Sequence, residues 1–249
     1  MDAGRQDGGN LNLSPTMDWQ TIIEIDRQLL GVINGNHNMF LDTLMLVLTS
    51  GATWIPLYVA LLYLVVKNNE TMGQIMLIMA CCALCFSLTE IVTDVIVKPA
   101  VARPRPNNDP EWMYMVHVVN GKRGVGYSFF SAHAANTFGI AIFFCLLVRN
   151  SIFSWLMATW SLVNCYTRLY LAMHYPTDIA VGLAYGALVG SVVYAIYYVA
   201  YRHISPKQRF VSSQYTSTGY SLTDVDVVAC VLVFTYLAAI IISLMMHDL

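Results

Sequence analysis

One short segment, Thr167 to Asp178 (TRLYLAMHYPTD), places an arginine, a histidine and an aspartate at the boundary of two long apolar runs. Charged groups are costly beside hydrocarbon, so a cluster at such a boundary more often serves a reaction than folding. Pro176 disfavours helix at the residue before it, so the helix carrying Arg168 should end near His174 and a new helix should open at Asp178. His174 and Asp178 would then face each other across a tight turn.

This pair suits nucleophilic chemistry. A carboxylate that holds one imidazole nitrogen fixes the tautomer and leaves the other nitrogen free to attack. Arg168, about two helical turns before His174, could bind an anionic group through two parallel hydrogen bonds. The alternative is that Arg168 and His174 only anchor a helix end at the membrane interface, and the segment taken alone favours that alternative.

Two further segments carry residues that suit the same chemistry. Lys98 and Arg105 lie within a proline-rich stretch, and Ser131 and His133 open a later apolar run. Three cations and a hydroxyl donor around one point suit an oxyanion with several charged oxygens, above all a phosphate. Two histidines suit a transfer in two steps, provided that the fold brings the three segments together.

The composition shows what kind of protein must position these residues. Of the 249 residues, 57% are apolar and 11% are charged, and the mean hydropathy is +0.57. These values lie well outside the balance of a soluble domain and indicate an integral membrane protein. The net charge of −2 does not indicate the basic surface that binds nucleic acid. All six cysteines lie within apolar runs, so they indicate neither a disulfide framework nor a zinc site.

Six apolar runs are long enough to cross a membrane, since a span needs about 20 residues. The runs are Met39 to Val66 (broken at Ser50-Gly51), Met72 to Val97, Ala132 to Val148, Ile152 to Leu171, Thr177 to Ala200, and Val225 to Met246. Before them, residues 1–17 form a polar tail, and Trp19 to Ile33 has the spacing of an amphipathic helix on the membrane surface. In the fifth run, Gly182, Gly186 and Gly190 predict a smooth face for close helix packing.

The predicted fold class is therefore an all-α integral membrane protein with six transmembrane helices and a short amino-terminal amphipathic interfacial helix. We expect a single transmembrane domain over residues 1–249, in which 1–37 form the tail and interfacial helix and 98–178 carry the chemistry. Within the polar connection 98–131, an Asn120-Gly121 turn between valine-rich flanks predicts a small β-hairpin.

Six spans would put the amino terminus, the 98–131 connection and the His174 turn on one side of the membrane. With the suspected site residues set aside, that side carries Arg5, Arg27, Lys122 and Arg123, of which Arg5 lies in the far tail and should count little. The opposite side carries Lys67, Arg149, Arg202, Lys207 and Arg209. The positive-inside rule favours a cytoplasmic location for the second group, and so a site that faces outward.

The three segments together resemble the signature of the type 2 phosphatidic acid phosphatase superfamily, the membrane relatives of bacterial acid phosphatases and vanadium haloperoxidases. That signature is a lysine with Arg-Pro seven residues on, then Pro-Ser-Gly-His, then Ser-Arg, five residues, His, three residues and Asp. The first and third pieces match at every charged or imidazole position. Phe130 replaces the proline, Ala132 the glycine and Thr167 the serine, and Ala132 can present its backbone N–H to phosphate only if its φ is negative.

The resemblance implies a mechanism. His174 would attack phosphorus to form a phosphohistidine, Asp178 would orient it, and His133 would protonate the leaving oxygen and then activate water. The phosphoryl oxygens would be held by four residues, Lys98, Arg105, Ser131 and Arg168. No metal and no cofactor are implied.

The resemblance also implies a partner and a location. The partner is a lipid phosphate that stays in the bilayer, and the location is a bacterial inner membrane with an active site facing the periplasm or the outside. The substrate could be undecaprenyl diphosphate, lipid A, phosphatidylglycerol phosphate or phosphatidate. The amino-terminal amphipathic segment favours undecaprenyl diphosphate, by analogy alone. A phosphotransferase using the same intermediate and a catalytically silent scaffold are the alternatives, and a transporter fits less well because the ionisable residues gather at one face.

Other ionisable residues have simpler interpretations. Asp94 is one helical turn before Lys98 and should pair with it. Arg103 could be a second cation behind the site or a headgroup anchor. Among the remaining histidines, His37, His117, His203 and His247 have no matching partners in the sequence, and we expect surface or loop positions for them.

Overall fold

The computed structural model of the chain describes residues 19–204 and 213–247. The helices are α1 (Trp19–Gly35), α2 (Met39–Leu48), α3 (Ile55–Lys67), α4 (Met72–Glu90), α5 (Lys98–Val101), α6 (Ala132–Val148), α7 (Ser151–Tyr170), α8 (Pro176–Ile204) and α9 (Leu222–His247). Short 3₁₀ helices cover Gly51–Trp54 and Val119–Gly121, and a π-helical stretch over Ile91–Val97 joins α4 to α5. Within the described residues there is no β-strand, only an isolated bridge between Tyr215 and Ser221, so the predicted all-helical class is confirmed.

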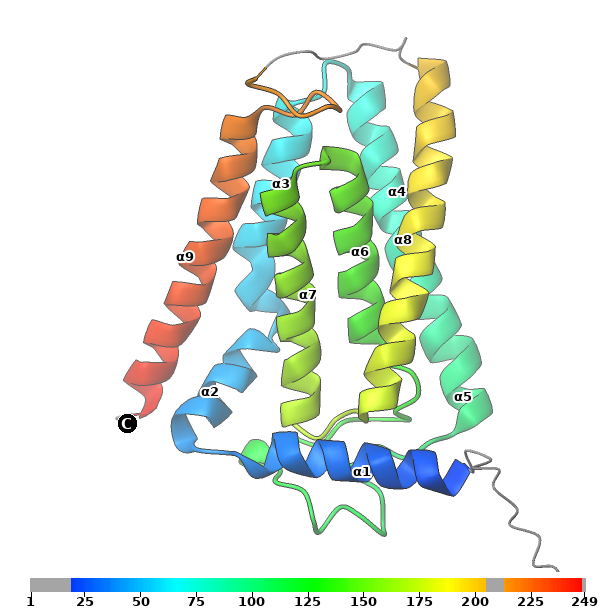
Figure 1. The fold of residues 1–249 in the computed structure, drawn as a ribbon, viewed down its shortest axis with the longest axis vertical. Helices are drawn as coiled ribbons and strands as arrows, with labels where there is room; N and C mark the ends of the chain where they lie inside the picture. The colour runs from blue at the N-terminus through cyan, green and yellow to red at the C-terminus, as the bar shows by residue number, and fades with distance from the viewer. Residues whose placement is uncertain (1–18, 205–212, 248–249) are drawn as a thin grey trace, which may run out of the picture.

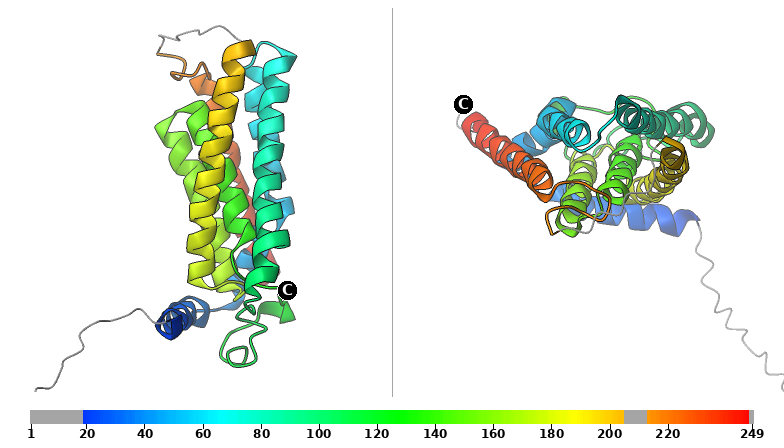
Figure 2. Two further views of the ribbon diagram at one scale, coloured as in Figure 1. Left: turned by 90° about the vertical axis from the view of Figure 1, so that its right-hand side faces the viewer. Right: turned by 90° about the horizontal axis from the view of Figure 1, so that it is seen from above.

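The long helices pack side by side into a bundle (Figure 1). At its centre, α6 packs against α4, α7 and α8, and both views in Figure 2 place it among these neighbours. At one end of the bundle, α1 lies across the ends of the long helices. The connection over residues 102–131 and the turn between α7 and α8 lie at that same end (Figure 1). The segments singled out by their chemistry therefore gather at one end of the molecule.

Glycines set the distance between α6 and α8, as their spacing predicts. A Cβ atom on Gly186 would lie 2.5 Å from the carbonyl oxygen of Ala135, and one on Gly182 would lie 2.7 Å from the carbonyl oxygen of Ser131. Both neighbours are backbone atoms, which cannot move aside without a shift of the helix. Any side chain at these glycines would therefore push α8 away from the start of α6.

Three helical segments of the described chain are long and apolar enough to cross a membrane, namely Met72–Val101, Pro176–Ile204 and Leu222–Met246. The pair Met39–Leu48 and Gly51–Lys67 passes the same test jointly and is bent by 64°, so it would be a fourth span that is broken. By contrast, α6 is apolar but has only 17 residues, and α7 is not among the helices that are both long and apolar enough to cross a membrane. The membrane class agrees with the sequence, and the count of six spans stays a prediction.

The break between α2 and the following 3₁₀ helix is stabilised by side chains. Trp54 donates its indole N–H to the carbonyl oxygen of Leu48 at 2.9 Å, and the Thr53 hydroxyl donates to the carbonyl oxygen of Val47 at 2.5 Å. These bonds satisfy carbonyl groups that a helix end leaves without a partner. They also hold Thr49, the residue at the break, in a defined position.

α1 has polar side chains on its buried face. Asp26 and Asn34 are 1% and 3% exposed, whereas Ile25, Leu29 and Val32 are among the exposed apolar side chains. The three exposed residues are spaced by four and three positions, so they share one face of the helix. That α1 lies on the membrane surface stays a prediction. Its polar residues give it a second role, because they contact the segments at this end of the bundle.

The β-hairpin predicted at Asn120-Gly121 is wrong. The two residues do turn the chain, with φ of 51° and 66°, but the turn is a 3₁₀ helix closed by the N–H of Lys122 and the carbonyl oxygen of Val119 at 2.9 Å. The flanks do not pair with each other, because the preceding flank is bound to α1. There, the Asn34 side chain accepts from the N–H of His117 at 2.6 Å and donates to its carbonyl oxygen at 3.0 Å.

Candidate active site

All three segments predicted to carry the chemistry meet at the end of the bundle that α1 crosses. Nη1 of Arg105, from the first segment, lies 3.3 Å from Nε2 of His174 in the third. The N–H of Ser131, from the second segment, donates to the carbonyl oxygen of Asp178 at 3.1 Å. His133, at the start of α6, is exposed and lies within electrostatic reach of His174.

The turn that carries His174 is longer than the sequence predicts and begins earlier in the chain. α7 ends at Tyr170 instead of near His174, because Ala172 adopts a left-handed conformation with φ of 50° that a helix cannot continue. α8 begins at Pro176, two residues before the predicted start, and proline suits a first helical position because it has no N–H to leave unpaired. His174 therefore lies in a short turn between two helix ends.

His174 is buried, and its two ring nitrogens face different partners. Nδ1 lies 3.5 Å from Oδ2 of Asp178, and Nε2 lies 3.3 Å from the Arg105 guanidinium. A guanidinium has only donors, so Nε2 must be the acceptor and Nδ1 carries the proton toward the carboxylate. Burial, opposed by Asp178 and reinforced by nearby arginines, lowers the pKa of His174 to about 4. The imidazole is thus neutral at neutral pH, with its lone pair on Nε2.

Asp178 is held by two further donors. Its Oδ2 accepts from the N–H of Tyr175 at 2.9 Å, and its Oδ1 accepts from Nη1 of Arg103 at 2.9 Å. The Arg103 guanidinium also lies 3.9 Å over the ring of Tyr175. Of the two interpretations of Arg103, a cation behind the site and a headgroup anchor, these contacts support the first.

Asp26 of α1 is a member of this network that sequence reasoning missed. Its carboxylate accepts from Nη2 of Arg103 at 2.7 Å, from the N–H of Thr177 at 2.9 Å and from the Thr177 hydroxyl. The sequence interleaves Asp26 with other polar residues of an amphipathic helix, so it looked like part of a solvated face. Asp26 is four residues before Leu30 and shares its face of the helix, but the structure, and not the spacing, shows that this face is buried.

Arg105 is fixed by backbone carbonyl groups. Its Nε donates to Val125 at 3.1 Å, and its Nη1 donates to Met173 at 3.2 Å. Gly124 is required here, because a Cβ on it would lie 2.4 Å from Cδ of Arg105. Burial lowers the pKa of Arg105, but an arginine titrates so far above neutrality that it stays charged. The cation is therefore held rigidly beside His174.

Arg168, in the last turn of α7, is held by a residue that the sequence did not single out. Its Nη1 donates to the Thr49 hydroxyl at 3.0 Å, at the break after α2. Its Nε is buried and has no hydrogen-bond partner among the described residues. A buried donor without a partner is costly in a protein, so this N–H is well suited to a phosphate oxygen.

Lys98 forms the predicted ion pair with Asp94, one helical turn earlier. The lysine side chain is 12% exposed, and the aspartate side chain is 46% exposed. A lysine has three donors, so this pair leaves two of them for another acceptor. The contact with Asp94 limits where the long side chain can point.

The second segment, Phe130 to His133, departs from the family signature at two positions and still forms a regular helix start. Ser131 is the N-cap of α6, and its hydroxyl accepts from the N–H of Ala134 at 3.4 Å. Ala132 begins α6 and is not among the residues with positive φ, so alanine fits where the family signature has glycine. Phe130 is buried, with its ring 5.2 Å from that of Tyr185. The helix therefore presents its positive amino-terminal end to the site.

A group of side chains that could hold a metal ion lies away from these residues. Within the described residues, one cluster of metal-ligating side chains is present, His37, Asp42 and His117, and it contains none of the seven predicted site residues. Positive charge near His174 comes from Arg105 and Arg168, and Lys98 lies within electrostatic reach of His133.

A helical membrane bundle that gathers a histidine–carboxylate pair, a second histidine and several cations at one end has the architecture of a membrane phosphohydrolase. The family model described as the PAP2 superfamily matches residues 74–202, a range that includes all seven predicted site residues. The chain belongs to this superfamily, and it is a lipid phosphate phosphatase, as the resemblance in its motifs predicts.

Two curated relatives carry the same name. The chain is 38% identical over 174 residues to a lipid A 4'-phosphatase of Bacteroides thetaiotaomicron, a match that covers 70% of this chain and 77% of the relative. It is 31% identical over 181 residues to a lipid A 4'-phosphatase of Porphyromonas gingivalis, covering 72% and 75%.

Two crystal structures share the fold. One is the first transmembrane PAP2 type phosphatidylglycerolphosphate phosphatase from Bacillus subtilis, with a TM-score of 0.56 and 18% identity, covering 77% of this chain and 92% of that one. The other is LpxE of Aquifex aeolicus, with a TM-score of 0.50 and 20% identity, covering 67% and 92%. At these identities the likeness describes the fold alone.

Proposed function

We propose that this phosphatase hydrolyses a phosphate monoester of lipid A, and that the phosphoryl group passes through a covalent bond to His174. The observation that carries the proposal is the setting of His174, whose Nδ1 faces Asp178 while its Nε2 faces Arg105. A neutral imidazole held in this way has its lone pair directed at the place where cations would bind phosphate oxygens.

In the first step, Nε2 of His174 bonds to phosphorus while the bond from phosphorus to the lipid oxygen breaks. His133 donates a proton to that oxygen, which leaves as the lipid hydroxyl. The phosphorylated imidazole carries a positive charge, which the Asp178 carboxylate stabilises through Nδ1–H. Asp178 can stay ionised in this role because Arg103 and the N–H of Tyr175 bind its oxygens.

In the second step, water displaces the histidine. His133, now neutral, accepts a proton from water as the water oxygen bonds to phosphorus and the bond to Nε2 of His174 breaks. Inorganic phosphate leaves, and both histidines return to their starting protonation states. The exposed position of His133 at the start of α6 suits a group that must meet first the leaving oxygen and then water.

The charge that develops on the phosphoryl oxygens is balanced by the surrounding donors. Arg105 comes from the 102–131 connection and Arg168 from the last turn of α7. Lys98 comes from α5, and Ser131 supplies a hydroxyl at the start of α6. Such pre-positioned donors need no reorganisation when the transition state forms. Since side chains supply the positive charge, we expect turnover without an added metal or cofactor.

The names of the two curated relatives support lipid A as the substrate, over the undecaprenyl diphosphate that analogy favours. A lipid substrate also fits an apolar groove of about 400 Å³ between α3, α4, α6 and α7. Its lining includes Phe86, Ile140 and Trp160, and it reaches Asn136 and Thr137, one turn along α6 from His133. An acyl chain in this groove would keep the headgroup near the site.

We further propose that the chain is a single transmembrane domain of a bacterial inner membrane whose site faces outward. Basic residues near the far end of the bundle include Lys67 at the end of α3, Arg149 between α6 and α7, and Arg202 in the last turn of α8. Outside the proposed site, the near end carries Arg27, Lys122 and Arg123, whereas the sequence adds Lys207 and Arg209 between α8 and α9. This asymmetry supports a cytoplasmic far end.

The proposal is tested by phosphate release from purified protein in detergent with EDTA. Lipid A, undecaprenyl diphosphate, phosphatidylglycerol phosphate and phosphatidate are compared by kcat/KM, and we expect lipid A to be the best substrate. His174→Ala should lower kcat by roughly 10⁴-fold or more, and His133→Ala by about 10²- to 10⁴-fold. The control is His203→Ala, which removes an exposed histidine at the far end of α8 and should leave kcat unchanged.

Three outcomes would contradict parts of the proposal. Phosphate release that persists in His174→Ala would exclude the phosphohistidine, and a higher kcat/KM for another lipid would exclude lipid A as the preferred substrate. Release of phosphate only when an acceptor lipid is added would identify a phosphotransferase.

A further inference from the structure

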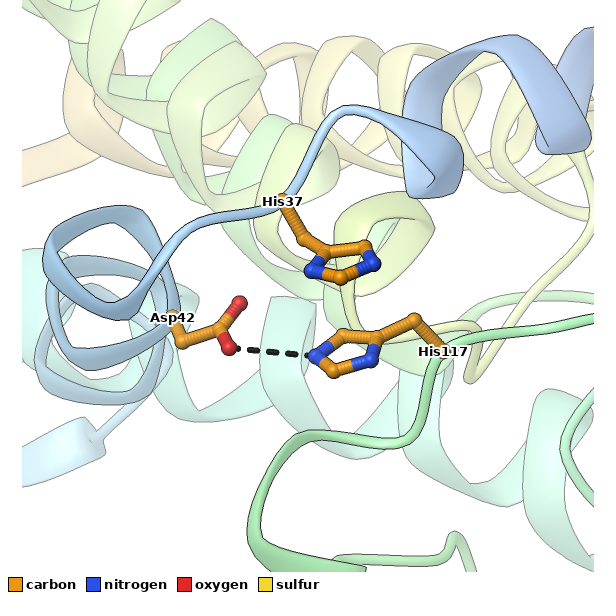
Figure 3. A group of neighbouring side chains, drawn as sticks. All are labelled: His37, Asp42 and His117. Atoms are coloured by element: carbon orange, nitrogen blue, oxygen red, sulfur yellow. Dashed lines mark hydrogen bonds and ion pairs between the residues drawn. The ribbon is translucent and has the colours of Figure 1, made fainter.

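A second group of histidines lies at the same end of the bundle, outside the catalytic residues. His37, in the connection between α1 and α2, stacks on His117 of the 102–131 connection, with ring centroids 3.7 Å apart and planes within 6° (Figure 3). Oδ2 of Asp42, in the first turn of α2, lies 3.1 Å from Nε2 of His117. Both histidines lie in connections between helices, as expected, and the structure adds partners that the sequence did not show.

We propose that His37, Asp42 and His117 bind one divalent transition-metal ion of the zinc class. One ligand atom from each residue lies within 4.8 Å of the other two. Figure 3 shows that each imidazole has a ring nitrogen on the side that faces the Asp42 carboxylate. Tetrahedral zinc holds its ligand atoms about 3.3 Å from each other, so modest side-chain rotations would bring the three atoms to bonding distance.

The ligands are oriented by residues behind them, which separates this cluster from a chance group of surface side chains. Oδ1 of Asp42 accepts from the Tyr170 hydroxyl at 2.7 Å, so Oδ2 is the oxygen left to face the histidines. The backbone of His117 is bound on both sides by the Asn34 side chain, through its N–H and its carbonyl oxygen. Such outer contacts are typical of metal sites and usually affect affinity.

Charge and donor type select the class of ion. Two neutral imidazoles and one carboxylate carry a net charge of −1, which partly neutralises a divalent cation. Nitrogen donors disfavour Ca²⁺ and Mg²⁺, which prefer oxygen, and favour zinc and its neighbours. His37 is exposed, and the side chains of Asp42 and His117 are 20% and 31% exposed, so water can complete the coordination.

The ion would brace this end of the bundle. Its ligands come from three segments, and Tyr170 links Asp42 to α7 just before the turn that carries His174. The connection that carries His117 also carries Arg105. None of the proposed phosphate-binding residues is a ligand, so the metal site and the proposed reaction share no side chain.

The test is metal binding by the purified full chain in detergent, after treatment with a chelator and its removal. Co²⁺ is the spectroscopic probe, and Zn²⁺ is added as a competitor. We expect one Co²⁺ per chain with visible absorption bands, displaced by Zn²⁺. His37→Ala, His117→Ala and Asp42→Asn should each weaken binding at least tenfold. Tyr170→Phe should weaken it by about 10- to 100-fold while keeping the three ligands.

Controls separate loss of the site from other causes. The side chain of His37 is exposed, so His37→Asn should keep the elution profile and Tm of the wild type while losing the Co²⁺ spectrum. His203→Ala should bind as the wild type does. X-ray absorption at the zinc edge should show nitrogen and oxygen neighbours at about 2.0–2.2 Å.

Two results would overturn the assignment. One is binding of equal affinity in the variant that lacks all three ligands. The other is sulfur neighbours at about 2.3 Å, which would place the ion on cysteines instead.

Discussion

Arg103 is one cation shared by two buried carboxylates, and its removal should strongly destabilise the folded protein. Its Nη2 lies 2.7 Å from Asp26, which is 1% exposed, and its Nη1 lies 2.9 Å from Asp178, which is 0% exposed. In Arg103→Gln, both carboxylates would lose their counter-ion while staying buried. If Arg103 only bound a lipid headgroup, its removal would leave no buried charge behind and would not destabilise the fold in this way.

The size of the loss follows from these contacts. Breaking a buried ion pair by removing one partner costs about 3–5 kcal/mol, mainly because the other charge stays buried. The N–H groups of Thr177 and Tyr175 still bind the two carboxylates, which keeps the loss within that range. At roughly 2–4 °C for each kcal/mol in a chain of this size, the Tm should fall by roughly 6–20 °C.

The assay is thermal unfolding in detergent, with a double-mutant cycle. Asp26→Asn removes one of the two stranded charges, so it should cost less in the Arg103→Gln background than in the wild type, with a coupling of about 1 kcal/mol or more. The matched control is Arg202→Gln, because Arg202 is exposed near the end of α8 and forms no ion pair with a described residue, and it should cost about 0.5 kcal/mol or less. Equal Tm shifts for the two arginine variants, with additive effects of Asp26→Asn, would refute this reasoning.

Three further predictions concern packing, positioning and protonation. Gly186→Ala should destabilise the protein by about 1–3 kcal/mol in thermal unfolding, because the new methyl group meets backbone atoms of α6, whereas Gly31→Ala, with open space around it, should be neutral or slightly stabilising. Thr49→Val removes the acceptor of Arg168, and the loss of about 1.5 kcal/mol should lower kcat/KM roughly tenfold. Nitrogen-15 NMR should show His174 neutral at pH 6, with its proton on Nδ1, and titrating near pH 4; an imidazolium at pH 6 would contradict the assigned tautomer. The pKa of His174 is about 4 in the folded protein, against an ordinary value of 6.5. Between pH 6.5 and 4 the unfolded state therefore binds more protons at His174 than the folded state does. The free energy of unfolding should fall as pH falls through that range.

The residues that carry the chemistry could be predicted because they are few and stand out against hydrocarbon. Charged and imidazole groups are rare in an apolar chain, so Lys98, Arg105 and the TRLYLAMHYPTD segment are visible from composition and spacing alone. The all-helical class and the break at Ser50-Gly51 could be predicted in the same way, because polar residues and glycines interrupt the apolar runs.

The partners of these residues could not be predicted, because they come from distant parts of the chain. Asp26 reaches Arg103 across 77 positions, and Thr49 reaches Arg168 across 119. Nothing in the spacing of an amphipathic helix says which of its carboxylates turns inward. The same limit explains the wrong hairpin, since Asn34 of α1 takes the backbone groups of His117.

The most direct test of the central claim is a search for the phosphorylated enzyme. Protein is mixed with lipid A carrying ³²P and quenched in alkaline detergent, which preserves a phosphoramidate. In wild-type protein quenched within the first turnover, label should appear on the protein before phosphate is released, be lost in acid, and map to His174 by mass spectrometry. In His133→Gln, both formation and hydrolysis of the intermediate should be slower. The same label should be absent from His174→Ala. Acid-stable label, or label on another residue of active protein, would contradict the phosphohistidine at His174.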